Sequence, residues 1–250
     1  MNNLLKDAVF RAIRLGVRWD DPVALQRFQQ WSKLVDLVRR LNVNVFVDVG
    51  ANRGNYARQL RAAGYRGLLI SFEPNPDDSK SVQRLAHGDG EWLVQNCALG
   101  DTEEQMTFHI NSFNGQTDMS SLLALKNNPQ NSKTISVQVS RLDNILPGMI
   151  TSIRSPRIFL KLDTQGYDKR AFDGAFGCLE RIIGLQSELS VMPLYNDAPH
   201  FTETLAHYEK TGFELMDLFT VNRTNDGRIV EYDCLMAKPR FFPAADSQYW

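Results

Sequence analysis

Two glycines and an aspartate follow an apolar run in residues 45–54, VFVDVGANRG. Gly50 and Gly54 permit a left-handed backbone and the close approach of a ligand to the main chain. Their spacing is not the G-x-G-x-x-G of dinucleotide sites, and no Gly-Lys-Ser/Thr of a phosphate loop follows. Asp48 precedes the first glycine, where its negative charge would repel a pyrophosphate and attract a cation. The turn predicts a ligand with positive charge, and the alternative is a tight corner between a strand and a helix.

A second acidic residue, Glu73, ends the next apolar run in the sequence SFEPNP. An acid in that place can accept hydrogen bonds from both hydroxyls of a ribose. The following run ends in QNCALGD, where we expect Asn96 to hydrogen-bond an adenine ring and Ala98 to offer it backbone contacts. These residues indicate an adenosyl ligand that is cationic and carries no phosphates. S-adenosylmethionine, with its ammonium and sulfonium groups, fits that description.

Methyl transfer from such a ligand to a neutral alcohol requires a base that removes the hydroxyl proton. The candidate catalytic residues are Asp163, at the end of an apolar run, Glu188 on the next run, and His200 in the segment PLYNDAPHF. Each has a structural alternative: Asp163 as a helix cap, Glu188 as a buried carboxylate, and His200 as a surface or capping residue. Alignment of the reacting atoms would supply most of the remaining catalysis.

Three hydroxyl-bearing residues are candidates for the acceptor pocket, namely Ser120, Ser121 and Tyr195. The alternatives are a serine turn and a tyrosine that only packs. Asp163 and Glu188 together could hold a divalent cation that acidifies the acceptor hydroxyl. No third ligand is evident in the sequence, so no residue is assigned as a metal ligand.

These residues must be positioned by the elements that alternate along the chain from residue 44 onward. Apolar runs predict strands, whereas apolar residues spaced three and four apart predict helices. The first half gives strands at 45–49, 67–72 and 91–99, with helices at 53–63 and 76–86. Residues 105–110 and 134–140 alternate in period two and predict an antiparallel pair around a polar insert, residues 111–133.

The second half resumes with a strand at 157–163 and strands at 181–189, 213–219 and 229–238. A helix from about Phe201 to Gly212 lies between two of them. The helix after residue 163 is expected to bury a single face, made of Tyr167, Ala171, Phe172, Ala175, Phe176 and Leu179. Repeated β-α units predict an α/β fold with a doubly wound, mainly parallel sheet. The final hairpin supplies an antiparallel C-terminal strand at or near the sheet edge.

Two helices are predicted before this alternation. Residues 1–19 place basic residues among apolar ones and fit an amphipathic helix that packs on the domain; contact with a membrane, or a cover over the site, is the alternative. Asp20-Asp21-Pro22 predicts the start of the second helix. We expect a helical extension over residues 1–43, the main domain over 44–240 and a tail over 241–250.

Composition excludes some classes of function. The net charge is −1, so no global field recruits nucleic acid. Three cysteines without C-x-x-C spacing indicate a reducing compartment, and no stretch of about 18 apolar residues predicts a membrane span. With no signal-peptide pattern at the N-terminus, we expect a cytoplasmic protein. The oligomeric state is open.

The ordered motifs VDVGANRGNYA, SFEPNP, NCALGD, SSL, LKLDTQGYD and SELSVMPLY resemble those of the FkbM-type S-adenosylmethionine-dependent methyltransferases. The resemblance covers about residues 44–240. It implies a class I, Rossmann-like methyltransferase domain that transfers methyl groups to oxygen. The acceptors it implies are hydroxyls of saccharides, glycolipids and other natural products.

The resemblance also implies roles for single residues. Asp48, Gly50, Asn52 and Gly54 would border the methionine part of the cofactor, Glu73 the ribose, and Asn96 and Ala98 the adenine. The stretch LKLDTQGYD departs from the family's usual K-x-D-x-E-G-x-E. Asp168 keeps the charge of the second glutamate on a shorter arm, whereas Gln165 lacks the charge of the first.

Two other functions stand beside O-methylation. One is a non-catalytic binding or scaffold module that retains the cofactor fold. The other is an NAD-dependent oxidoreductase, which the missing G-x-G-x-x-G and the absence of a Tyr-x-x-x-Lys pair after residue 163 disfavour.

Overall fold

The structure is a computed structural model that describes residues 22–127 and 132–242. The chain divides into two units, residues 1–34 and 35–250, and the boundary lies within the helix α2 (Pro22–Arg40). The amphipathic helix predicted for residues 1–19, the acidic start at Asp20-Asp21 and most of the C-terminal tail lie outside the described residues. No helix in the described part of the chain is long and apolar enough to cross a membrane.

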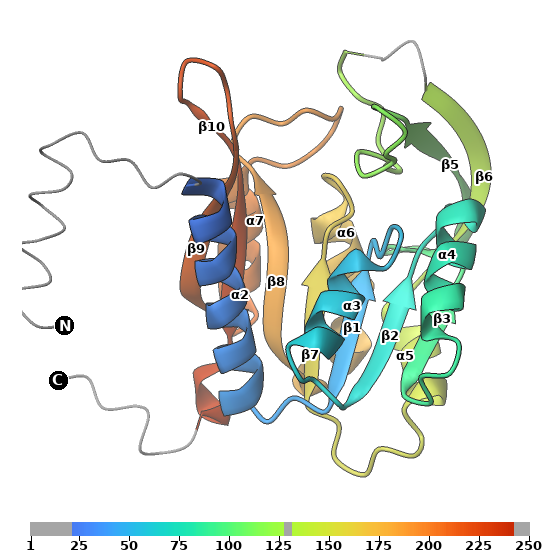
Figure 1. The fold of residues 1–250 in the computed structure, drawn as a ribbon, viewed down its shortest axis with the longest axis vertical. Coiled ribbons are helices and arrows are strands. Elements are labelled where there is room, and N and C mark those ends of the chain that lie inside the picture. Colours follow the sequence, from blue (N-terminus) through green and yellow to red (C-terminus); the bar gives the residue numbers. More distant parts are fainter. Residues whose placement is uncertain (1–21, 128–131, 243–250) are drawn as a thin grey trace, which may run out of the picture. The chain divides into compact units, whose positions relative to one another are not determined.

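A seven-stranded sheet forms the centre of the second unit (Figure 1). Five neighbouring strands pair in parallel, in the order β3, β2, β1, β7 and β8. The strand β10 is antiparallel to both of its neighbours, β8 and β9. This is the doubly wound, mainly parallel sheet with an antiparallel C-terminal strand that the sequence predicts. In spatial order the strands are β3 (Trp92–Gln95), β2 (Leu68–Phe72), β1 (Val45–Val49), β7 (Ile158–Leu162), β8 (Ile182–Ser190), β10 (Ile229–Ala237) and β9 (Glu214–Arg223).

The continuous apolar runs become strands buried on both faces. Every residue of β1, β2 and β7 is buried, which is typical of parallel strands covered by helices on either side. The helices α3 (Asn55–Ala62) and α4 (Pro76–Ala86) cover one face. On the other face lie α5 (Leu142–Met149), α6 (Asp168–Asp173) and α7 (Phe201–Lys210), whose apolar residues share one core cluster with the strands.

A three-stranded sheet stands beside the large one, in the order β4 (Ala98–Leu99), β6 (Ser132–Ser140), β5 (Glu104–Asn111). The predicted antiparallel pairing of the two period-two segments is confirmed in β5 and β6. The single strand predicted over 91–99 is wrong: β3 ends at Gln95, and β4 joins the small sheet. Between them the Asn96 side-chain amide donates to the carbonyls of Glu73 and Pro74, which turns the chain out of the large sheet.

The single helix predicted after residue 163 is also wrong. The chain forms the short α6 and then a 3-10 helix over Phe176–Arg181. Gly174 separates them, and a β-carbon there would lie 1.9 Å from the carbonyl oxygen of Gly100. Phe176, placed on the inner face by its spacing, is 46% exposed. The helix α5 was not predicted, because Pro147 and Gly148 in its last turn weaken the helical pattern.

Candidate functional site

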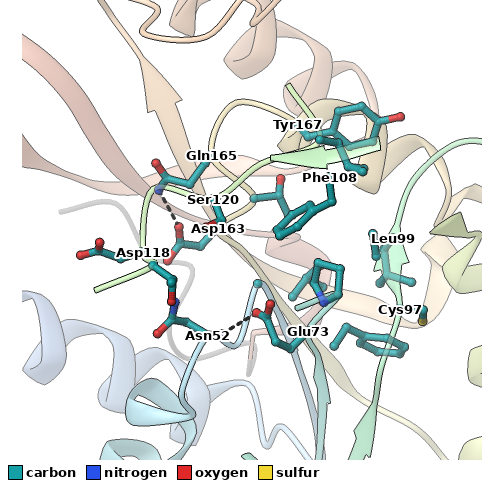
Figure 2. A pocket seen from close by; sticks show the side chains of 18 residues that line it. Asn52, Glu73, Cys97, Leu99, Phe108, Asp118, Ser120, Asp163, Gln165 and Tyr167 are labelled. Atoms are coloured by element: carbon teal, nitrogen blue, oxygen red, sulfur yellow. Dashed lines mark hydrogen bonds between the residues drawn. The ribbon is translucent and has the colours of Figure 1, made fainter. Parts of the chain in front are cut away.

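A cavity lies at the carboxyl ends of β1, β2 and β7, with about 620 Å³ of space that is partly open to solvent (Figure 2). In α/β sheets of this kind, ligands bind at this edge of the sheet. The lining residues are Val49, Gly50, Asn52, Phe72, Glu73, Pro74, Cys97, Ala98, Leu99, Phe108, Thr117, Asp118, Ser120, Leu122, Asp163, Thr164, Gln165 and Tyr167.

The glycine turn forms one wall of the cavity. Gly50 has a φ of 74°, and a β-carbon there would lie 1.9 Å from the carbonyl oxygen of Asp163, so only glycine fits. The backbone amides of Gly50 and Ala51 both donate to the carbonyl oxygen of Phe72, which fastens the turn to the end of β2. Gly54 has a φ of 79° at the start of α3 and packs on Val82 and Leu85 of α4. It does not line the cavity.

Glu73 is the buried carboxylate of the cavity, with 5% of its surface exposed. One oxygen accepts the backbone N–H of Asn52 at 2.7 Å, and the other accepts that of Asn75 at 2.9 Å. Burial raises the pKa of Glu73 to about 7, against the lowering effect of these two hydrogen bonds. The side chain is therefore fixed in position and changes charge near neutral pH.

An apolar end of the cavity lies beyond Glu73, formed by Phe72, Ala98 and Leu99 with the thiol of Cys97. Ala98 lies where the sequence places it. Asn96 does not line the cavity, because its side-chain amide is bonded to the carbonyls of Glu73 and Pro74. The neighbouring Cys97 and Leu99, not singled out from the sequence, do line it.

Asp48 is fully buried and does not line the cavity. Its Oδ1 lies 2.9 Å from the Nζ of Lys161, which faces it on the neighbouring strand β7. The same Nζ lies 3.4 Å from Oδ2 of Asp163. Burial lowers the pKa of Lys161, but the two carboxylates outweigh that effect and hold the pKa above its ordinary value. Asp48 thus pairs with a cation of the chain itself and acts on the cavity only through Lys161.

One side of the cavity is lined by the connection between β5 and β6. We call its described part, residues 112–127, the insert. Thr117 fastens it at one end: its hydroxyl donates to Oδ2 of Asp78 at 2.7 Å and accepts from the side chain of Asn52 at 3.2 Å. Arg53 adds a 2.7 Å bond to the carbonyl oxygen of Gly115. We call these three contacts the latch.

The predicted acceptor residues separate into one that lines the cavity and two that support it. Ser120 lines it. Ser121 is buried, and its hydroxyl lies 2.8 Å from the carbonyl oxygen of Gln165, which ties the insert to the segment after β7. Tyr195 is also buried, with its hydroxyl 2.9 Å from Oε1 of Gln165 and 2.9 Å from the carbonyl oxygen of Met119.

An acidic end of the cavity, around Asp163, Gln165 and Asp118, lies across from Leu99 and Cys97, with Glu73 between the two ends (Figure 2). Nε2 of Gln165 donates to Oδ1 of Asp163 at 3.1 Å and to Oε2 of Glu188 at 2.9 Å. Burial raises the pKa of Glu188 well above its ordinary value, and the nearby carboxylates add to the shift. The structure therefore brings together two of the three predicted catalytic residues.

His200 is not part of this group. It is exposed at the start of α7, where its Nδ1 lies 2.9 Å from the hydroxyl of Thr202. That is the capping position given above as its alternative. The described residues also contain no group of three His, Cys, Asp or Glu side chains that could hold a metal ion. The side-chain amide of Gln165 lies between Asp163 and Glu188, at the position where a divalent cation shared by these two carboxylates would bind.

Lys161 and Thr117 are the main site residues that sequence reasoning missed. A lysine inside the otherwise apolar run RIFLKLD was the available signal for Lys161, since a buried ammonium requires a carboxylate partner. Thr117 had no signal, because its contacts come from Asn52 and Asp78, distant in the chain.

Residues 48–215 match the methyltransferase FkbM domain. The sequence matches no curated protein. Among solved structures, the chain is similar to magnesium protoporphyrin IX methyltransferase from Synechocystis PCC 6803 with bound SAM, at 9% identity and a TM-score of 0.47, covering 86% of this chain and 80% of that one. TehB from Haemophilus influenzae is 10% identical with a TM-score of 0.46, covering 83% and 61%.

Proposed function

Because the chain belongs to the FkbM methyltransferase family, and is thus an S-adenosylmethionine-dependent methyltransferase, we propose that it methylates a hydroxyl oxygen. The acceptor is a saccharide, a glycolipid or another hydroxylated natural product. One observation carries the proposal: a single cavity is lined by both the buried carboxylate Glu73 and the half-exposed carboxylate Asp163. Glu73 can accept hydrogen bonds from the hydroxyls of a ribose, and Asp163 can accept the proton of an acceptor hydroxyl.

The residues of the cavity fit S-adenosylmethionine. Glu73 offers a fixed carboxylate to the ribose hydroxyls, and Phe72, Ala98 and Leu99 offer apolar walls to the adenine. Gly50 and Asn52 line the cavity beside Glu73 and would border the methionine part. When bound, the cofactor supplies an activated methyl group.

Asp163 is the proposed proton acceptor. A bound S-adenosylmethionine would supply the methyl carbon that the acceptor oxygen attacks, and its sulfur would keep the electron pair of the broken carbon–sulfur bond. The hydroxyl proton passes to the Asp163 carboxylate and from there to solvent. Lys161, with its Nζ 3.4 Å from Oδ2 of Asp163, pairs with this carboxylate and helps to hold it in position. Alignment of the acceptor by the insert, with Ser120 at the cavity, supplies the rest.

Acceptor methylation tests the proposal. The full chain is incubated with methyl-labelled S-adenosylmethionine and a panel of neutral glycosides and other alcohols, and the product linkage is read by mass spectrometry and NMR. We expect a methyl ether. Asp163→Asn should reduce kcat by about 100-fold or more while cofactor affinity changes little. Asp226→Asn, in the exposed turn of the final hairpin, is the matched control and should retain full activity.

Three results would contradict the proposal. Methyl transfer to nitrogen, carbon or sulfur only would exclude O-methylation. Full activity of Asp163→Asn would remove this residue as the base. Binding of S-adenosylmethionine without turnover across the whole panel would favour a non-catalytic binding module.

A further inference from the structure

Gln165 occupies the position between two carboxylates that sequence reasoning treated as catalytic alternatives. Its amide nitrogen donates one hydrogen bond to Asp163, at 3.1 Å, and one to Glu188, at 2.9 Å. An amide nitrogen has two hydrogens, so both are used on this pair. Asp163 follows β7 and Glu188 lies on β8, so the amide joins the ends of two neighbouring strands.

Contacts on its other side fix the orientation of this amide. Oε1 of Gln165 lies 2.9 Å from the hydroxyl of Tyr195, which is buried. The backbone of Gln165 has a φ of 56°, and its carbonyl oxygen accepts the hydroxyl of Ser121 at 2.8 Å. A flipped amide would turn its oxygen toward two carboxylates, which are acceptors as well. In the observed orientation both hydrogens of the amide face carboxylate oxygens, and the single hydrogen of the Tyr195 hydroxyl is shared between Gln165 Oε1 and the carbonyl oxygen of Met119.

The surroundings of the pair are strongly acidic. Glu188 is faced by Asp233 and Glu231 from β10, by Asp163 after β7 and by Asp168 at the start of α6. On the side of Asp163, the ammonium of Lys161 is shared with Asp48. In such a place a neutral donor stabilises two carboxylates, whereas a third carboxylate would repel them.

We propose that Gln165 is a positioning residue for proton transfer, which holds the carboxylates of Asp163 and Glu188 as one hydrogen-bonded pair and keeps Asp163 directed into the cavity. The inference rests on the proposed function, in which Asp163 accepts the hydroxyl proton. It gives a chemical reason for the glutamine in LKLDTQGYD, since a glutamate there could not donate to both carboxylates.

The test compares Gln165→Glu and Tyr195→Phe with the wild-type chain. Gln105→Glu, the same change at an exposed position of β5, is the matched control. Carbon-13 NMR of the side-chain carboxyls, recorded against pH without any acceptor, follows the titration of Asp163 and Glu188. We expect Gln165→Glu to raise the pKa of one of them by about one unit or more. The control should leave both unchanged.

The kinetic readout uses a hydroxyl acceptor from the panel above. Gln165→Glu is expected to move the acidic limb of the kcat profile to higher pH, with the KM for S-adenosylmethionine within about threefold of wild type. Tyr195→Phe keeps both carboxylates and removes only the hydroxyl that orients the amide. We expect it to reduce kcat by roughly tenfold through misplacement of the base. It remains informative if Gln165→Glu does not fold.

Unchanged carboxyl titrations in folded Gln165→Glu would overturn the inference. Wild-type kcat in Tyr195→Phe would overturn it as well. If kcat of Gln165→Glu fell equally at every pH, with no shift of the pH profile, Gln165 would have only a structural role and the inference would fail. The two proposals fail separately: shifted titrations without any methyl ether would refute O-methylation, and methyl ether formation with unshifted titrations would refute the role of Gln165.

Discussion

Glu73 carries a charge that depends on pH in the range where the protein is expected to work. Both of its oxygens already accept backbone N–H groups, from Asn52 and Asn75, so its position is fixed before any ligand binds. Its pKa is about 7 because burial outweighs these bonds. Ribose hydroxyls donate hydrogen bonds, and an ionised carboxylate accepts them better than a protonated one.

Cofactor affinity should therefore fall as the pH is lowered through 7. Ligand binding favours the ionised form, so each unit below pH 7 should weaken binding by up to about tenfold. Calorimetry from pH 5.5 to 8.5 measures this. The cofactor's own amino group also titrates and can add a second pH dependence. Glu73→Gln has no carboxylate at this position, so any pH dependence that it retains comes from the cofactor. Glu214→Gln, exposed on β9, is the control. The same pH dependence in Glu73→Gln as in wild type would contradict the role of Glu73.

The buried pair of Asp48 and Lys161 is a second feature at the residue scale. Both side chains are at most 3% exposed, and their charged atoms lie 2.9 Å apart. Removing one partner leaves an uncompensated buried charge, which is more damaging than removing both.

Lys161→Met should lower the free energy of unfolding by about 3–5 kcal/mol, because Asp48 is left buried and unpaired. The double variant Asp48→Asn with Lys161→Met should recover part of that loss. Urea unfolding at pH 7 measures both. The loss of unfolding free energy in the double variant is compared with the sum of the losses in Lys161→Met and Asp48→Asn. A loss equal to that sum would show that the two residues are not coupled.

At the scale of elements, the insert closes the cavity over the sheet edge. It is held to α4 and to the glycine turn by the latch, and to the segment after β7 by Ser121. Because Thr117, Asp118 and Ser120 line the cavity, we expect a bound cofactor to contact this part of the insert. Hydrogen bonds in the latch should thus act on the rates of binding.

Thr117→Val keeps the size of the side chain and removes its hydrogen bonds to Asp78 and Asn52. Each such bond contributes about 0.5–1.5 kcal/mol, so S-adenosylmethionine should dissociate about 2- to 10-fold faster. Stopped-flow fluorescence measures the rate. Thr134→Val, exposed on β6, is the matched control and should dissociate the cofactor like wild type. A dissociation rate equal to wild type in Thr117→Val would show that the latch does not control access.

At the scale of the whole molecule, a nearly neutral chain concentrates acidic groups at one end of one cavity. The net charge is −1, yet Asp163 and Asp118 line the acidic end of the cavity, and the Gln165 amide joins Asp163 to Glu188. The field of this end repels anions. It favours an uncharged or cationic acceptor over a phosphorylated or carboxylated one.

A neutral hexoside should accordingly be methylated with a kcat/KM at least about tenfold higher than the matching uronate at low salt. Competition between the two acceptors, followed by mass spectrometry, measures the ratio. Asp118→Asn should reduce the ratio of the two kcat/KM values, since it removes one carboxylate from the lining of the cavity. Equal use of both acceptors would contradict the electrostatic argument.

The sequence alone determined the alternation of strands and helices and the edge of the sheet at which the cavity lies. Strand and helix periods are local, and the carboxyl ends of parallel strands meet at one edge, so Gly50, Glu73 and Ala98 could be placed together from the order of the runs. The tertiary structure decided what each charge pairs with. Lys161 takes up the charge of Asp48, Gln165 bridges Asp163 and Glu188, and His200 lies outside the cavity. These outcomes depend on side chains far apart in the chain, whose separation no local period encodes.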